Sequence, residues 1–318
     1  MILITGCAGF IGYHLSLRLL KKNKKILGID NLNSYYDKTL KIDRLKQLKK
    51  FKNFKFINLE ITDFKKTYKN IKKNFFSTIV HLAAQPGVRY SFLNPSLTLY
   101  NNLNSFNNII EIARLKNVKR FIYASSSSVY GEVKKIPFSE NDISIKPISI
   151  YGASKLSNEI IASAYSKNYK LNCFGLRFFT VYGPYGRPDM AYYSFALKNL
   201  KNKKIQLYNN ANMFRDFTYI DDVVAAITKI INLKNTSNSN QIFNIGKGKP
   251  DKLKDLVHSL EKRLNNKFDI YYKKFIPKGD IKKTYSNNRK IRRVLKWSPK
   301  ISLDKGIKKF VYWFKKRH

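Results

Sequence analysis

The sequence predicts an α/β protein built on a doubly wound parallel sheet. Short apolar stretches alternate with longer amphipathic stretches as far as about residue 172, a pattern typical of strands connected by helices. An apolar stretch from Ile2 also runs straight into a turn with glycines at positions 6, 9 and 12, and then into an amphipathic stretch that ends near Lys22. The length of 318 residues is enough for one large α/β domain or two modest ones.

The remaining elements are expected in order after this first strand, turn and helix. Apolar, β-branched stretches predict strands, and apolar residues at helical spacing predict helices. In the first part of the chain we expect strands at 25–30, 55–59, 76–84, 120–124 and 171–179, helices at 40–48, 94–116 and 149–169, and a loop at 85–91. In the less regular second part we expect loops at 180–189 and 236–240, strands at 213–220 and 241–245, and helices at 223–232, 253–264 and 303–314. Asp221 and Asp222 are expected to cap the helix at 223–232, and the strand at 241–245 is expected to return to the sheet.

The glycine turn predicts a binding site for a dinucleotide pyrophosphate. Backbone N–H groups at a helix N-terminus attract anions, and glycines let the phosphates approach closely. The residues assigned to this contact are Gly6, Gly9, Phe10, Ile11 and Gly12. Their Gly-x-x-Gly-x-x-Gly spacing departs from the commoner Gly-x-Gly-x-x-Gly fingerprint and is the form found in short-chain dehydrogenases. The alternative is a tight strand-to-helix turn that binds nothing.

Residues at the ends of the next strands indicate which dinucleotide binds. Asp30 ends the second strand, where a carboxylate accepts hydrogen bonds from ribose hydroxyls and repels a ribose phosphate. No basic residue precedes Lys38 in the following loop, so Asp30 predicts NAD, unless it only caps that loop. The fourth strand ends in small residues, among them Ala83, which let the backbone approach the cofactor. Asp63 either accepts a hydrogen bond from the adenine amino group or caps the next helix.

Ser126, Tyr151 and Lys155 form the candidate catalytic set. Tyr151 and Lys155 are four residues apart and so share one face of a helix. A free phenol titrates near pH ~10, but an ammonium group and a cationic nicotinamide beside it favour the phenolate, which can accept a hydroxyl proton. Ser126 follows the strand at 120–124 and can hydrogen-bond the same substrate oxygen. Tyrosine and lysine are abundant here, so the pair alone is also compatible with an exposed helix face. His81 is expected to be a hydrogen-bonded core residue.

Composition limits the class of protein. Two cysteines, Cys7 and Cys173, cannot form a disulfide framework and are expected to be buried side chains of a reducing compartment. The first strand begins directly after Met1, and no apolar run approaches the ~18 residues of a membrane span, so we expect a cytoplasmic protein without a membrane partner. The formal net charge of +42 ordinarily suggests nucleic acid. The lysines are scattered through almost every surface segment, however, so no specific nucleic-acid partner is expected.

Five separated blocks identify a family. They are residues 31–45 (NLNSYYDKTLKIDRL), 84–91 (AQPGVRYS), 124–131 (ASSSSVYG), 178–189 (FFTVYGPYGRPD) and 214–222 (FRDFTYIDD). On these blocks the chain resembles, over essentially its whole length, the extended short-chain dehydrogenases of the NAD-dependent epimerase/dehydratase family, and within it the UDP-glucuronate 4-epimerases. The resemblance implies a Rossmann-type NAD-binding domain at 1–175, to which 221–245 returns, and a smaller C-terminal α/β nucleotide-sugar-binding domain at 176–318.

The resemblance also implies roles for individual residues. Ser126, Tyr151 and Lys155 would catalyse 4-epimerisation of UDP-glucuronate to UDP-galacturonate through a transient 4-keto sugar, with tightly held NAD as the hydride carrier and no metal site. The residues that match substrate-contacting positions are Ser127, Ser128, Thr180 and Arg187 for the sugar carboxylate, Arg215 for the diphosphate, Asp280 for the uridine, and Arg89 in the loop over the site. Ser127 and Ser128 fit a small-residue turn equally well. Pro277 departs from the family, which has Gln or Arg there, and Lys278 is the candidate replacement.

Other functions share the scaffold. Dehydratases of this family carry Asp-Glu at the positions of Ser127 and Ser128, and UDP-glucuronate decarboxylases carry Glu at the position of Ser128, so both are disfavoured. The alternative is UDP-glucose 4-epimerase or another nucleotide-sugar epimerase or decarboxylase of the family. The intact catalytic set argues against a silent NAD-binding or nucleic-acid-binding protein. Because relatives pair through helices, the helices at 94–116 and 149–169 predict a homodimer.

Overall fold

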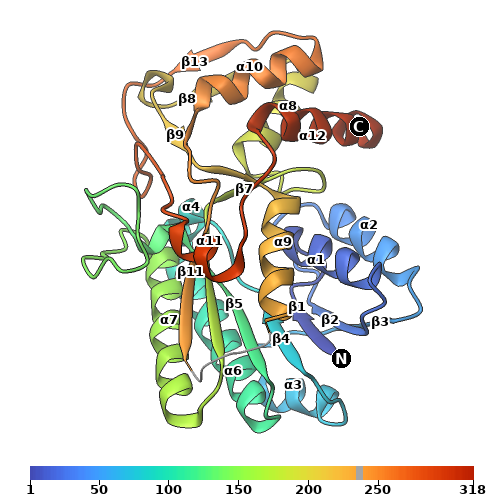
Figure 1. Cartoon of the computed structure of the whole chain (residues 1–318). Helices are drawn as coiled ribbons and strands as arrows, with labels where there is room; N and C mark the ends of the chain where they lie inside the picture. Colours follow the sequence, from blue (N-terminus) through green and yellow to red (C-terminus); the bar gives the residue numbers. More distant parts are fainter. Residues whose placement is uncertain (234–238) are drawn as a thin grey trace.

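A parallel sheet forms the centre of the computed structural model, which describes residues 1–233 and 239–318 (Figure 1). Within these residues, seven strands pair in parallel in the order β11-β6-β5-β4-β1-β2-β3. They are β1 (Ile2–Thr5), β2 (Ile26–Asp30), β3 (Phe54–Asn58), β4 (Thr78–His81), β5 (Arg120–Ser126), β6 (Cys173–Phe178) and β11 (Asn240–Ile245). The order reverses between β1 and β4, and doubly wound sheets bind ligands beside such a reversal, at the carboxyl ends of the strands. The predicted fold class is confirmed.

Helices cover both faces of the sheet, because neighbouring residues of a strand point to opposite faces. Leu3 packs in the buried cluster with α3 (Phe64–Ile71), α6 (Ser105–Leu115) and α7 (Ile150–Tyr169). Its neighbour Ile4 packs in the cluster with α1 (Phe10–Leu20), α2 (Lys38–Lys49) and α9 (Ile220–Ile231). Strands β1, β2 and β4 are buried along their whole length, which explains why they read as continuous apolar stretches.

Two expectations for residues 85–116 are wrong. The predicted loop at 85–91 becomes helix α4 (Val88–Leu93) from its fourth residue, and the predicted helix at 94–116 is divided into α5 (Pro95–Leu99), a π-helical turn η1 (Tyr100–Asn104) and α6. Asn94 leaves the helical conformation, with φ −134° and ψ 63°, and Pro95 starts a new helix, because proline suits the first turn of a helix and not its interior. π-Helical turns are frequent at functional sites.

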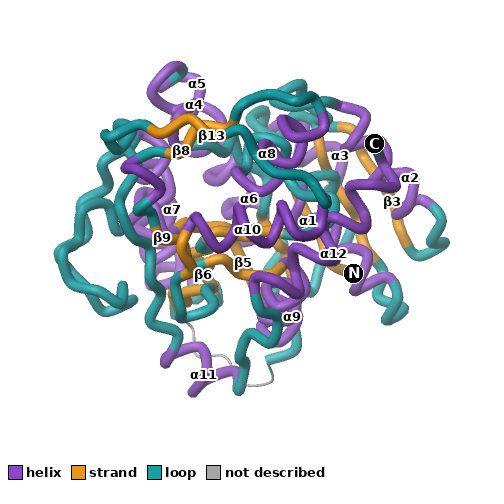
Figure 2. Tube along the Cα trace, turned by 90° about the horizontal axis from the view of Figure 1, so that it is seen from above, coloured by secondary structure: helices purple, strands orange, loops and turns teal. Residues whose placement is uncertain are grey.

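Most of the second part of the chain forms a smaller layer at the carboxyl end of the sheet, seen from the side in Figure 1 and from above in Figure 2. Its strands pair two by two: β7 (Thr180–Tyr182) with β10 (Phe217–Tyr219), β8 (Ile205–Leu207) with β13 (Ile270–Tyr272), and β9 (Phe214–Arg215) with β12 (Asp251–Lys252). Its helices are α8 (Ala191–Leu200), α10 (Leu253–Leu264) and α12 (Leu303–Arg317), while the short α11 (Arg289–Leu295) lies beside β11. This layer closes the space above the strand ends.

The predictions for this part are met unevenly. The helices predicted at 253–264 and 303–314 are present as α10 and α12, and the strand predicted at 241–245 enters the sheet as β11. The strand predicted at 213–220 is two short strands, and α8 and α11 were not predicted. Asp221 and Asp222 do not cap α9: Tyr219 is the N-cap residue, and the Asp222 carboxylate accepts a hydrogen bond from Ile301 N at 3.0 Å. Positions 236–238 of the predicted loop lie outside the described residues, and the domain division at 175 stays a prediction.

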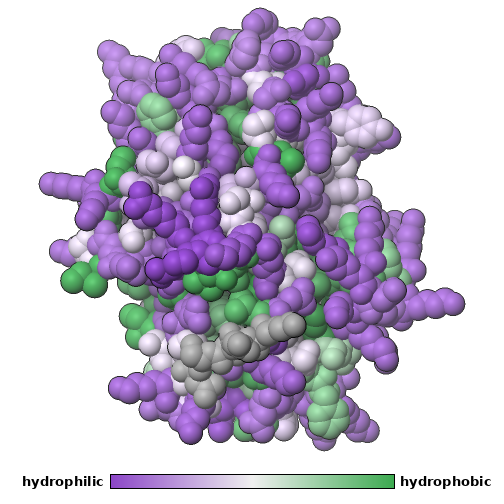
Figure 3. Space-filling view, in the orientation of Figure 1, coloured by the Kyte–Doolittle hydropathy of each residue, from purple (hydrophilic) through white to green (hydrophobic). Residues whose placement is uncertain are grey.

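The surface is hydrophilic over most of the face shown in Figure 3, and its darkest hydrophilic side chains gather in the middle of the view, over the region of α11. Across the ranges 1–233 and 239–318, no helix combines the length and the apolar character that crossing a membrane requires. The wide distribution of polar side chains agrees with the scattered lysines of the sequence.

Replacing Gly12 by alanine is expected to destabilise the first strand, turn and helix. A Cβ atom at Gly12 would lie 2.1 Å from the Gly6 carbonyl oxygen, so β1 and α1 would have to move apart. Overpacking of this kind costs about 1–3 kcal/mol. Denaturant unfolding measures the change. Gly9→Ala is the matched control, since its Cβ would stand 3.0 Å from the same oxygen, and equal stability of Gly12→Ala and the parent would contradict this packing.

Candidate active site

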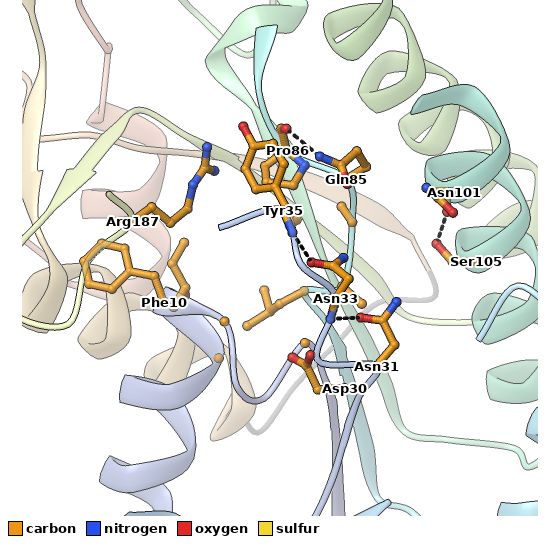
Figure 4. Close-up of a pocket in the computed structure, with 18 of the residues that line it drawn as sticks. Phe10, Asp30, Asn31, Asn33, Tyr35, Gln85, Pro86, Asn101, Ser105 and Arg187 are labelled. Carbon is orange, nitrogen blue, oxygen red and sulfur yellow. Dashed lines mark hydrogen bonds between the residues drawn. The ribbon is translucent and has the colours of Figure 1, made fainter. Parts of the chain in front are cut away.

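Two cavities lie at the carboxyl ends of the strands and meet at one group of residues. The first has a volume of about 730 Å³ and extends from the glycine turn to the end of β5 (Figure 4), and the second has a volume of about 630 Å³ and reaches the smaller layer. The residues that line both are Tyr35, Tyr90, Ser126, Tyr151, Phe178, Phe179, Arg187 and Met190. Ser126 and Tyr151 therefore stand where a molecule in one cavity can react with a molecule in the other.

The first cavity suits a pyrophosphate where it meets α1. The lining residues there are Gly6, Gly9, Phe10, Ile11 and Gly12. Helix α1 follows Gly9, which supplies no side-chain cap, so the N–H groups of its first turn can face an anion. Gly6 has φ +71°, and a Cβ atom there would lie 2.8 Å from Ala83 N, so this tight approach of the turn to the end of β4 requires glycine.

Asp30 fits the adenosine end of a dinucleotide. It is 8% exposed, lines the first cavity and ends β2. Its Oδ2 accepts a hydrogen bond from Ala8 N at 3.1 Å, and its Oδ1 accepts one from Leu32 N at 2.9 Å. These bonds fix the carboxylate and leave each oxygen a second acceptor position. A pair of ribose hydroxyls fits this arrangement, and a ribose phosphate does not.

Strand β5 and helix α7 bring the catalytic set together. Ser126 is the last residue of β5, and Tyr151 and Lys155 lie in the first two turns of α7. Lys155 Nζ is 5.9 Å from the centroid of the Tyr151 ring. Ser126 Oγ accepts a hydrogen bond from Ser128 N and donates one to Ser128 Oγ, both at 3.1 Å. The hydroxyl and the phenol thus lie at the junction of the cavities, and the ammonium group lines the first cavity beside the phenol.

Burial controls the protonation of both titrating groups. Burial raises the pKa of the Tyr151 phenol, while the Arg187 charge and the Ser126 hydroxyl oppose that rise. Lys155 is 2% exposed, and burial lowers its pKa to about 8. The protein's own groups therefore do not suffice to produce a phenolate at neutral pH. The additional positive charge expected from a nicotinamide ring is needed as well.

The sugar end of the second cavity carries a guanidinium group and three hydroxyls. Arg187 donates from Nε to Asp189 Oδ1 at 3.0 Å and from its terminal nitrogen to Oδ2 at 2.5 Å. Thr180, Ser127 and Ser128 line the same cavity. Guanidinium groups bind carboxylates through paired N–H donors, and hydroxyls can add further donors. The group predicted from the sequence is therefore brought together.

The far end of the second cavity carries cations and an aromatic ring. Arg215 donates to Asp280 Oδ1 at 2.5 Å, and the Arg89 guanidinium lies 5.2 Å from the centroid of the Tyr208 ring. Lys278 lines the cavity as well. Burial lowers the pKa of Arg215, and the Asp280 carboxylate opposes that effect. Such a cluster suits a diphosphate. The sequence suggested separate ligand contacts for Arg215 and Asp280, whereas the structure pairs them with each other.

Asp63 is the one predicted site residue that lines neither cavity. It is the N-cap of α3 and accepts a hydrogen bond from Lys66 N at 2.9 Å, which was the alternative left open; its role toward adenine stays a prediction. His81 is confirmed as a core residue, because its Nδ1 lies 2.8 Å from Thr5 Oγ1 and burial lowers its pKa to about 3. Within the described residues, no three His, Cys, Asp or Glu side chains are placed to hold a metal ion.

Sequence reasoning missed the arginine that connects the loops around the site. Arg44 is fully buried and donates to the carbonyl oxygens of Ala8, Tyr185 and Gly186 at 2.8, 2.6 and 3.0 Å, and to the Tyr36 hydroxyl at 2.6 Å. It therefore joins the glycine turn, the loop after β2 and the loop that leads to Arg187. The only signal in the sequence was an arginine among the apolar positions of the predicted helix at 40–48.

Two cavities lie on the carboxyl edge of a doubly wound sheet and meet at a tyrosine, beside which the first cavity also carries a lysine. This arrangement defines a nucleotide-dependent enzyme of the short-chain dehydrogenase class. A family model described as GDP-mannose 4,6 dehydratase matches residues 3–310. The chain belongs to this family of NAD-dependent epimerases and dehydratases.

Several relatives are similar over the full chain. UDP-glucuronate 4-epimerase 4 of Arabidopsis thaliana is 40% identical, with 98% of this chain and 75% of that protein covered. The structure of UDP-glucuronic acid 4-epimerase from Bacillus cereus in complex with UDP-glucuronic acid and NAD has a TM-score of 0.91 at 33% identity, covering 100% and 99% of the two chains. The structure of UDP-glucose 4-epimerase from Thermotoga maritima with UDP-glucose has a TM-score of 0.90 at 30% identity, covering 99% of each chain.

Lys155→Met is expected to stabilise the protein at neutral pH while abolishing its activity. A lysine whose pKa falls from 10.5 when unfolded to about 8 when folded binds fewer protons in the folded state between these values, so stability rises with pH across this window. The penalty is complete below pH 8 and absent above pH 10.5. The variant should exceed the parent by roughly 1–3 kcal/mol at pH 7.

Denaturant unfolding at pH 7 and pH 10 measures this difference. It should shrink as the pH rises. Lys167→Met is the matched control, because Lys167 is an exposed lysine of the same helix and should show no such pH dependence. A variant less stable than the parent at both pH values would show that Lys155 carries no burial penalty.

Proposed function

We propose that this protein is an NAD-dependent 4-epimerase that interconverts UDP-glucuronate and UDP-galacturonate. The observation that carries the proposal is the meeting of the two cavities at Ser126, Tyr151 and Arg187, where a proton-transfer set and a carboxylate-binding group adjoin. The similarity to UDP-glucuronate 4-epimerases at 40% and 33% identity supports the same substrate.

Each residue of the candidate catalytic set has a separate role in the proposed reaction. Bound NAD supplies the acceptor and then the donor of the hydride at C4 of the sugar. Tyr151 takes the proton of the O4 hydroxyl and later returns it. Lys155 stabilises the phenolate electrostatically, and Ser126 hydrogen-bonds O4 and keeps it aimed at Tyr151. The 4-keto sugar turns between the two hydride transfers, so the configuration changes without net oxidation.

The carboxylate group explains why Arg187 and the three hydroxyls are needed. A 4-keto-uronic acid is a β-keto acid, and it loses carbon dioxide when its C5–carboxylate bond aligns with the π system of the ketone. Arg187, Thr180, Ser127 and Ser128 line the sugar end of the second cavity and can hold the carboxylate out of that alignment. The same contacts select a uronate over a neutral hexose.

The nucleotide end fits a UDP group. Arg215 and Arg89 supply N–H donors for the diphosphate, and Lys278 adds a cation where Pro277 departs from the family. Arg215 contacts only one oxygen of the Asp280 carboxylate. The other oxygen can accept a hydrogen bond from the uridine end of the substrate.

UDP-glucose 4-epimerase is the second candidate. It is favoured by the similarity to the Thermotoga maritima enzyme, whose TM-score of 0.90 is close to that of the Bacillus cereus enzyme. The two candidate functions differ in the protein group that contacts C6 of the sugar.

A homodimer in the cytoplasm is part of the proposal, with the chain divided near residue 175 and no specific nucleic-acid partner. Leu93, Leu97, Tyr100 and Ile160 are large apolar side chains exposed on α4, α5, η1 and α7, which pack side by side. Apolar patches of this kind mark interfaces, and a second copy of the same helices would cover them symmetrically.

Tyr151→Phe tests the base. Removing the phenol should lower the rate of UDP-glucuronate epimerisation by on the order of 10²–10⁴, with NAD content unchanged. Proton NMR of UDP-glucuronate incubated with the purified protein separates UDP-galacturonate from UDP-pentose. A parent that yields no UDP-galacturonate would refute the proposed function, and an unimpaired variant would refute the role of Tyr151.

Arg187→Ala tests the carboxylate contact. It should lower kcat/KM for UDP-glucuronate by more than tenfold, because hydrogen bonds between charged groups contribute about 1.5–3 kcal/mol, and should leave UDP-glucose turnover nearly unchanged. Steady-state kinetics with both substrates measures the change. If the variant handles UDP-glucuronate as well as the parent, Arg187 has no carboxylate role and the neutral hexose becomes the better substrate.

A further inference from the structure

Arg187 does not stand alone at the junction of the cavities. Both nitrogens that face Asp189 donate to its two carboxylate oxygens, and the side chains of the pair are 22% and 36% exposed. Of the five guanidinium N–H groups, two are used by Asp189 and three remain for a ligand. The direction in which those three point is fixed by the plane of the fork.

Tyr35 holds this pair from the other side of the site. Its hydroxyl donates to Asp189 Oδ2 at 3.1 Å, and the Arg187 guanidinium lies 5.8 Å from the centroid of its ring. Tyr35 belongs to the loop after β2, five residues beyond Asp30, and lines both cavities. A side chain from the dinucleotide half of the sequence therefore determines how a side chain of the substrate half is oriented (Figure 4).

The loop that carries Tyr35 is itself fixed. Tyr35 N donates to Asn33 Oδ1 at 3.3 Å, and Lys41 Nζ donates to the same Oδ1 at 2.7 Å and to Asn33 O at 3.0 Å. The Tyr35 hydroxyl also passes close to Gly87, where a Cβ atom would lie 2.6 Å from it. The loop after β2 and the start of α4 thus leave this hydroxyl little room to move.

The backbone just before Arg187 is fixed by a different group. Arg44 donates to the carbonyl oxygens of Tyr185 and Gly186, so the position of the Arg187 Cα does not depend on Asp189. Loss of Tyr35 or Asp189 would free the guanidinium and leave the loop in place. The two residues consequently affect the orientation of the donors and not the presence of the arginine.

We infer that Tyr35 and Asp189 are positioning residues for substrate selection: they hold the Arg187 guanidinium in the orientation that accepts a sugar carboxylate. The inference rests on the proposed function, since it assumes that Arg187 meets a carboxylate. Selection between a uronate and a neutral hexose then depends on a hydrogen bond from the loop that also follows the ribose-binding Asp30. Both residues contact Arg187, and in this inference they act through it.

The test compares the Kd of UDP-glucuronate with that of UDP-glucose by calorimetry on the NAD-loaded protein, in a Tyr151→Phe background that slows turnover. The preference is the Kd of UDP-glucose divided by the Kd of UDP-glucuronate. This ratio does not depend on the fraction of folded protein, which affects only the stoichiometry. Tyr35→Phe should reduce the preference for UDP-glucuronate by about three- to tenfold, which is less than a directly lost hydrogen bond to a charged group would cost, because Tyr35 acts on the ligand only through Asp189 and Arg187. Asp189→Asn removes one of the two hydrogen bonds that Arg187 donates to the carboxylate, and should reduce the preference for UDP-glucuronate by about tenfold or more.

Matched controls separate positioning from general damage. Tyr165→Phe removes another tyrosine-to-carboxylate hydrogen bond of 3.1 Å, to Glu111, and Asp304→Asn removes the carboxylate partner of Arg263. None of these four residues lines either cavity, so both controls should keep the parent ratio. In an Arg187→Ala background, Tyr35→Phe should have no further effect on the ratio, because residues that act through one partner are not additive.

Each result decides between the inference and its alternatives. A stronger preference for UDP-glucuronate in Asp189→Asn than in the parent would overturn the inference, because Asp189 would then be an anion that competes with the sugar carboxylate for Arg187. An unchanged preference for UDP-glucuronate in Tyr35→Phe would overturn it as well. The same holds for a further fall in this preference when Tyr35→Phe is added to Arg187→Ala, and for a parent that binds both sugar nucleotides equally. A parent that does not convert UDP-glucuronate in the NMR assay refutes the proposed function instead, so the two failures are distinguishable.

Discussion

The site depends on a buried ammonium group placed beside a buried phenol. Lys155 is 2% exposed and its pKa falls to about 8, so the fold holds a charge where charge is unfavourable. The sheet makes this possible, because the end of β5 and the start of α7 bring Ser126 and Tyr151 to the junction of the two cavities and Lys155 to the wall of the first. Burying the Lys155 charge costs stability, and trade-offs of this kind are usual at active sites.

A second buried cation joins the two halves of the sequence. Arg44 has no carboxylate partner among the described residues. Carbonyl groups and one hydroxyl accept hydrogen bonds from its two terminal nitrogens instead, while its buried Nε has no hydrogen-bond partner there. Because those carbonyls belong to the glycine turn and to residues 185–186, the dinucleotide-binding turn and the loop of Arg187 share one fixed reference. The distance between the glycine turn and the loop of Arg187 is therefore set by the packing of α2 as well as by the sheet.

Sequence reasoning succeeded where local patterns determine the structure and missed what long-range contacts determine. The alternation of apolar strands and amphipathic helices predicted the sheet, and the glycine spacing predicted the first cavity, because each is encoded in neighbouring residues. The resemblance of five blocks supplied the residues of the second cavity. The break at Asn94 had a local signal in Pro95, whereas the π-helical turn and the pairing of Arg215 with Asp280 depend on packing between distant segments. No local pattern signals these two features, and the same holds for Tyr35, which lies 154 residues before the carboxylate it contacts.

Both ligand-facing arginines of the second cavity are paired with an aspartate at 2.5 Å, Arg187 with Asp189 and Arg215 with Asp280. Both pairs are only partly buried, with side-chain exposures of 22% and 36% and of 16% and 33%, so water screens part of their attraction. In each pair the carboxylate also helps to fix the orientation of the donors. The consequence is that an anionic ligand meets two arginines whose orientation is set before binding and whose charge is partly neutralised. The strength with which this cavity binds an anion then depends on hydrogen-bond geometry as well as on net charge, even in a chain with a formal charge of +42.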